Sequence, residues 1–134
     1  MKHFLFIFAW FCLTNLSVNA QTNTWIGAGA NANWNNTANW SLNAVPTAAN
    51  DVVIPTGFTV NLNVAGATNS IVIQGNSTFN MSSNLSILNA SSFASNVTVN
   101  WSSSSLIGGG NLTNNGTIIL STAGSRYISG GTTL

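Results

Sequence analysis

The sequence predicts an all-β protein built as a right-handed parallel β-helix, or β-solenoid, with a Trp-rich cap at its N-terminal end. Three observations predict this fold. Short runs alternate apolar and polar residues with the period of a strand. Turn phrases recur, with GNSTFN from Gly75 and GNLTNNGT from Gly110. The chain also holds 22 Asn residues, and stacked turns let Asn side chains bond one another in ladders.

A β-sandwich is the alternative architecture for many short strands separated by frequent turns. The outward positions of the alternating runs are Thr, Asn and Ser, whereas a sandwich ordinarily carries more charge on its outer faces. The repeat is degenerate, with about 20 residues per rung, which lies within the range of solenoids. These features favour the solenoid over the sandwich.

Residues 1–20 are predicted to be a secretory signal peptide. Lys2 and His3 precede an apolar run over residues 4–13, which is too short to span a bilayer as a permanent helix. Val18 and Ala20 then supply the small residues of a cleavage site. An uncleaved anchor is the alternative. We expect a mature chain that begins near Gln21, is secreted or held at the cell surface, and has no integral membrane span after cleavage.

Residues 21–50 are expected to form the cap. Trp25, Trp34 and Trp40 gather in this segment. The open apolar end of a solenoid must be covered, and terminal repeats are atypical for that reason. Indole rings bury much apolar area, so Trp40 is expected to lie buried against the first rung. The alternative function of the same three rings is a platform for sugar stacking.

Residues 51–134 are expected to form the rungs. Pro46 and Pro55 bracket a first strand at 51–54, since proline suits strand boundaries. Alternating runs at 58–64, 79–81, 85–87, 97–101 and 118–120 predict further strands. Turns are expected at Gly66, at residues 102–105 and at residues 108–110. The rungs are expected to be incomplete at the C-terminus, leaving an open edge through which the protein self-associates.

Few reactive side chains lie outside the predicted signal peptide, which holds the only Lys, His and Cys of the chain. The remaining titratable side chains are Asp51, Arg126 and Tyr127. Acid–base catalysis and glycoside hydrolysis need paired groups, so we expect no enzyme and no catalytic residue. No cofactor or metal is expected, because no acidic cluster is present.

The two opposite charges, Asp51 and Arg126, balance and form no basic patch, which excludes phosphate-driven nucleic-acid binding. Asp51 is expected to accept backbone N–H bonds at the turn before the first strand. Arg126 is expected to be a solvated outer residue on the face of its strand opposite Tyr127.

One segment resembles a known group of proteins. Residues 38–57, ANWSLNAVPTAANDVVIPTG, resemble the opening of large secreted repeat proteins of Bacteroidetes-type bacteria, similar to parallel β-helix surface proteins and adhesins. The phrases GGGNLTNNGTIIL and SGGTTL resemble their rungs. The resemblance implies a non-catalytic structural or adhesive module whose partners are glycans or the surface of a host or neighbouring cell. Such proteins are longer and often end in a sorting domain, which implies that this chain is a fragment.

Three other functions remain open from the sequence. The first is a carbohydrate-binding module that uses exposed Trp side chains. The second is an ice- or surface-binding face made of Thr and Asn rows. The third is a non-catalytic N-terminal fragment of a polysaccharide-degrading β-helix enzyme.

Overall fold

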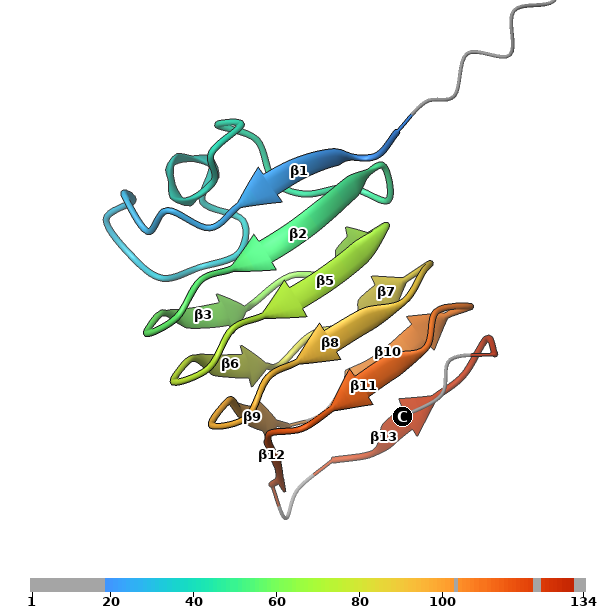
Figure 1. The fold of residues 1–134 in the computed structure, drawn as a ribbon. Coiled ribbons are helices and arrows are strands. Elements are labelled where there is room, and N and C mark those ends of the chain that lie inside the picture. Colours follow the sequence, from blue (N-terminus) through green and yellow to red (C-terminus); the bar gives the residue numbers. More distant parts are fainter. Residues whose placement is uncertain (1–18, 103, 122–123, 132–134) are drawn as a thin grey trace, which may run out of the picture.

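A computed structural model of the chain describes residues 19–102, 104–121 and 124–131. These residues wind through about four turns, and each turn adds one strand to each of three sheets (Figure 1). All named strands pair in parallel, each with the strand three places along the chain in the stacked turns. The predicted all-β solenoid is therefore confirmed, and the antiparallel sandwich is not the architecture.

We name each sheet after its strand in the first full turn. The β2 sheet contains β1 (Gln21–Thr24), β2 (Asn50–Ile54), β5 (Ser70–Ile73), β8 (Ser91–Phe93) and β11 (Leu112–Asn114). The β3 sheet contains β3 (Thr59–Leu62), β6 (Thr78–Met81), β9 (Thr98–Trp101) and β12 (Thr117–Leu120). The β4 sheet contains β4 (Gly66–Thr68), β7 (Leu85–Ile87), β10 (Ser104–Gly108) and β13 (Arg126–Ile128). The only described helix is one 3-10 turn, η1 (Thr37–Asn39), in the cap.

Strand register sets the length of the repeat. Thr59, Thr78, Thr98 and Thr117 are partners in consecutive strands, so the turns of this sheet are 19, 20 and 19 residues long. Because the side-chain period of a strand is two, this register stacks like positions on like positions through the whole sheet. The expected repeat of about 20 residues agrees with this spacing.

The core is a set of stacked apolar rows inside the three sheets. In the β3 sheet, Val60, Phe79 and Val99 form one buried row, and Leu62, Met81 and Trp101 form the next. Burying each such side chain contributes about 1.5–3 kcal/mol. The inward positions of the alternating runs are thus the ones that hold the solenoid together.

The turns between the β2 and β3 sheets share one backbone conformation. Gly57, Asn76 and Asn96 have φ values of 86°, 58° and 63° at matching places in consecutive turns. Glycine adopts this left-handed region freely, and Asn is among the side chains that tolerate it best. Part of the Asn content of the chain therefore serves the turns.

Several expected boundaries are wrong. The strand at 51–54 is preceded by β1, which pairs in parallel with β2 from Gln21↔Asn50 to Thr24↔Val53. Gly66 begins β4 instead of making a turn, and it occupies a buried inward position. Glycine is placed there because of close packing, since an added Cβ would lie 2.9 Å from Leu62 Cδ1. Two of the serines expected in a turn, Ser104 and Ser105, begin β10.

The predicted signal peptide lies almost wholly outside the described residues, which begin at Asn19. In the described part of the chain, no helix is long and apolar enough to cross a membrane.

Candidate binding surface

Trp25, Trp34 and Trp40 meet edge to face at the N-terminal end of the solenoid. The ring centroids of Trp25 and Trp40 are 4.9 Å apart, and those of Trp34 and Trp40 are 4.8 Å apart. The three residues are 1%, 0% and 1% exposed, and Trp34 reaches the core at Phe79. Edge-to-face packing of buried indoles stabilises a core. Stacking on a sugar needs an open ring face, so this arrangement favours the cap over the sugar platform.

Buried amides hold the cap loops in place. Asn39 donates from Nδ2 to the carbonyl oxygens of Asn31 (2.8 Å) and Asn33 (3.1 Å), while its Oδ1 accepts the N–H of Gly29 at 2.8 Å. Asn23 donates to the Ala44 carbonyl oxygen at 2.8 Å. Both residues are buried, and their bonds satisfy loop groups that would be costly to leave unpaired. Neither role was predicted from the sequence, and the available signal was the position of Asn23 and Asn39 close to Trp25 and Trp40.

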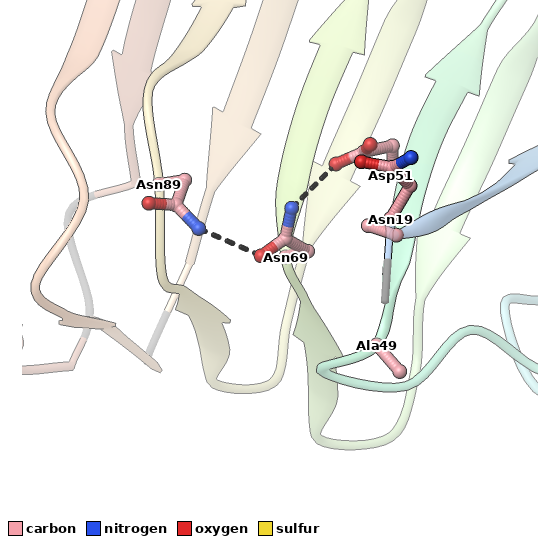
Figure 2. A pocket seen from close by; sticks show the side chains of 6 residues that line it. Asn19, Ala49, Asp51, Asn69 and Asn89 are labelled. Carbon is pink, nitrogen blue, oxygen red and sulfur yellow. Dashed lines mark hydrogen bonds between the residues drawn. The ribbon is translucent and has the colours of Figure 1, made fainter. Parts of the chain in front are cut away.

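Asp51 ends a ladder of amides along the β2 sheet (Figure 2). Asn89 Nδ2 donates to Asn69 Oδ1 at 2.7 Å, and Asn69 Nδ2 donates to Asp51 Oδ1 at 2.7 Å. The hydroxyl of Ser70 donates to the same Asp51 oxygen at 2.6 Å. The expectation of backbone N–H partners is wrong, because the parallel register brings side chains of the next turn beside the carboxylate.

The ladder borders an open polar hollow of about 470 Å³. It is lined by Asn19, Ala20, Ala49, Asp51, Asn69 and Asn89. Asp51 is the only titratable side chain of this lining, so the hollow holds no pair of groups for acid–base chemistry.

Arg126 is not the solvated residue that the sequence suggested. Its Nε donates to the Trp101 carbonyl oxygen at 2.9 Å, and Nη1 donates to the Gly124 carbonyl oxygen at 3.2 Å. Nη2 donates to both oxygens of Ser121, with 2.8 Å to Oγ. The guanidinium has five donors in a fixed fork, which suits it to gather carbonyl groups where the chain leaves β12. Tyr127 points the other way and is exposed, as expected for adjacent strand residues.

The last described turn carries an apolar hollow of about 390 Å³. Trp101, Ile118, Leu120, Arg126 and Ile128 line it. Leu120 is 58% exposed and Ile128 is 42% exposed. In the described residues, β11, β12 and β13 are the edge strands of the three sheets at this end, with β1, β3 and β4 at the opposite edges. This end therefore combines exposed apolar side chains with strand edges that can pair with another chain.

The outer side of the β3 sheet carries two regular rows, which we call the Thr–Asn face. Thr59, Thr78, Thr98 and Thr117 form one row, and Asn61, Asn80 and Asn100 form the other. Asn100 Nδ2 donates to Asn80 Oδ1 at 2.8 Å, Asn80 Nδ2 donates to Asn61 Oδ1 at 2.7 Å, and Asn61 Nδ2 lies 3.5 Å from Asn33 Oδ1 in the cap. The predicted Asn ladders are thus present, and the phrases TVNL, TFNM and TVNW are their sequence signal.

Few side chains that could bind a metal or act in catalysis lie among the described residues. No cluster of three or more His, Cys, Asp or Glu side chains occurs among the residues the structure describes. Comparison of the chain with protein-family models, with curated proteins and with solved structures gave no match.

Proposed function

We propose that the chain is a non-catalytic structural or adhesive module of an exported β-solenoid surface protein. The observation that carries the proposal is the separation, onto different sheets, of the titratable side chains that the structure describes. Asp51 ends an amide ladder of the β2 sheet, whereas Arg126 and Tyr127 lie on β13 of the β4 sheet. Catalysis by proton transfer needs two such groups within reach of one substrate atom.

The shape of the module supports a structural role. Parallel stacking gives each turn the same set of bonds to its neighbours, so stability grows by adding like units. The Trp cluster covers the apolar core at one end, while the last described turn exposes Leu120 and Ile128 at the other. The leader pattern supports export, and residues 38–57 resemble the openings of adhesin-like β-helix proteins.

The experiment is a paired assay on the purified chain. Beads coated with the protein settle on glycan-coated, cell-coated and bare surfaces, and their retention under flow is measured. The same protein is incubated with a panel of neutral and acidic polysaccharides. We expect retention above bare surfaces and no cleavage products.

Asp51→Asn is the matched control, because it keeps the size of the side chain and removes its charge. It is expected to behave like the wild type in both assays. Cleavage by the wild type that is abolished in Asp51→Asn would overturn the proposal. A lack of retention on every surface would overturn the adhesive role and leave the structural one.

A further inference from the structure

The Thr–Asn face has an order that a merely structural module does not require. Neighbouring strands lie about 4.8 Å apart, and alternate side chains of one strand lie about 6.6 Å apart. The register of β3, β6, β9 and β12 repeats these spacings without a slip. The face therefore presents hydroxyl and amide groups in a lattice that is regular in two directions over β3, β6 and β9. In β12 the Thr row continues with Thr117, and the exposed Ile119 takes the place of the Asn.

The amides of this face are held in fixed orientations. Asn80 both donates to Asn61 and accepts from Asn100, which fixes the plane of its amide. Asn61 and Asn80 each keep one N–H and one oxygen lone pair that the row does not use, and Asn100, at the end of the row, keeps one N–H and both lone pairs. Side-chain ladders of this kind also stabilise flat sheets, which otherwise twist.

The Thr row supplies free hydroxyls. Among the described residues, the hydroxyls of Thr59, Thr78, Thr98 and Thr117 make no hydrogen bond to another side chain or to the backbone. Thr is stiff at χ1, so each residue offers one methyl group and one hydroxyl in a near-constant orientation. Binding of a partner that matches this row therefore costs little side-chain entropy, because the Thr side chains are already ordered.

The chemistry of the face limits the partner to a neutral one. Its outward residues carry no charge, and the aromatic residues of the same strands, Phe79 and Trp101, are buried inside. A single polysaccharide chain repeats in one direction and is gripped mainly by exposed rings, which the face lacks. A crystalline surface of water repeats in two directions and offers only hydrogen-bond donors and acceptors.

From this geometry we infer that the Thr–Asn face binds the surface of ice. The oxygen repeat along the basal axes of hexagonal ice is slightly shorter than the spacing between strands. Because the row has only four Thr residues, the mismatch stays small, and successive Thr hydroxyls lie close to successive lattice positions. The Thr methyl groups lie in the openings of that lattice, and the free amide groups of the Asn row bond the adjoining water layer. This inference does not rest on the proposed adhesive function, because the argument for that function uses the positions of Asp51, Arg126 and Tyr127, and none of these residues lies on the Thr–Asn face.

The test measures partition of the purified chain into a slowly growing ice crystal, together with inhibition of ice recrystallisation. The double variant Thr78→Lys with Thr98→Lys places two charges at the centre of the face. The matched control is Ser86→Lys with Ser92→Lys, which adds the same charges to outward positions of the β4 and β2 sheets. Circular dichroism and the melting temperature establish that each variant is folded.

We expect the wild type and the control pair to enter ice and the Thr78/Thr98 pair to lose on the order of tenfold in recrystallisation inhibition. If the Lys pair fails to fold, Thr78→Val with Thr98→Val removes the hydroxyls while keeping the β-branched shape, and it is expected to lose activity also. Full activity of the folded Val pair would overturn the inference. Exclusion of the wild type from ice would overturn it as well, and binding of that excluded protein to crystalline chitin or cellulose would assign the face to a solid polysaccharide instead.

Discussion

The indole nitrogen of Trp40 donates a hydrogen bond of 2.8 Å to the main-chain carbonyl oxygen of Trp34. Both residues are fully buried, and their rings meet edge to face. One side chain therefore packs against the core and also satisfies a buried carbonyl group of the cap.

Trp40→Ala is expected to lower the free energy of unfolding by about 3–5 kcal/mol, because it opens a cavity in the cap. Trp40→Phe is expected to cost less, because it keeps a ring but loses the bond to Trp34. Chemical denaturation measures both effects. Leu88→Ala, at an exposed side chain, is the control. An unchanged denaturation midpoint for Trp40→Ala would contradict its role in the cap.

The centre of the Asn ladder is expected to matter more than its end. Asn80 takes part in two ladder bonds and Asn100 takes part in one. Asn80→Ala should lower the free energy of unfolding by about 1–2 kcal/mol and Asn100→Ala by about half of that, since each net hydrogen bond is worth about 1 kcal/mol. Asn115→Ala, at an exposed turn residue, serves as the comparison. Equal effects at the three positions would mean that the ladder adds no stability.

Two neighbouring glycines are expected to differ sharply. A Cβ added at Gly110 would lie 2.4 Å from the carbonyl oxygen of Asn89, whereas one added at Gly109 would meet nothing within 4 Å. Gly110→Ala should therefore separate the third and fourth turns and cost about 1–3 kcal/mol. Gly109→Ala should change stability by less than about 0.5 kcal/mol. Thermal unfolding of the two variants compares them directly, and a larger loss for Gly109→Ala would rule out this packing.

The last described turn is expected to drive self-association. Leu120→Lys with Ile128→Lys places charges in its apolar hollow and should raise the monomer fraction in sedimentation velocity. Leu88→Lys changes an exposed apolar residue elsewhere and should leave the association unchanged. A wild-type protein that stays monomeric at high micromolar concentration would refute this prediction.

Hydrophobic alternation predicted the strands of the β3 sheet, whereas the choice of a solenoid over a sandwich also needed the recurrent turn phrases and the high Asn content. Val60 and Leu62 alternate with Thr59 and Asn61, and burial selects one face of such a strand. The strands β4 and β8 could not be found in this way, because the inward residues of β4 are Gly66 and Thr68, and β8 has a single apolar inward residue, Phe93, beside the polar Ser91. Thr68 and Ser91 are buried, and each is satisfied by hydrogen bonds to backbone groups of the stack. A pattern of apolar residues cannot reveal such positions.

The hydrogen-bond partners of Asp51 and Arg126 could not be predicted from the sequence, because they depend on the register between turns. Asp51 bonds side chains 18 and 19 residues further along the chain, and Arg126 bonds a carbonyl group 25 residues earlier. These pairings can be predicted only when the length of each turn is known without an error of even one residue. The degenerate repeat of the sequence set that length only approximately.

The constant length of the turns also bears on how the chain folds. Side-chain bonds within the two ladders of the stacked turns span 18 to 20 residues. Each added turn therefore closes a loop of the same length, and the entropy cost of loop closure per turn stays constant as the array grows. Side-chain bonds from the cap to the first turn span 28 or 29 residues. Sequence separation slows the formation of contacts, so the stacked turns are expected to gain amide protection first and the cap to dock onto them afterwards. Under this order, the Trp cluster closes a scaffold that is already in place, and pulse-labelled hydrogen exchange would follow the two stages separately.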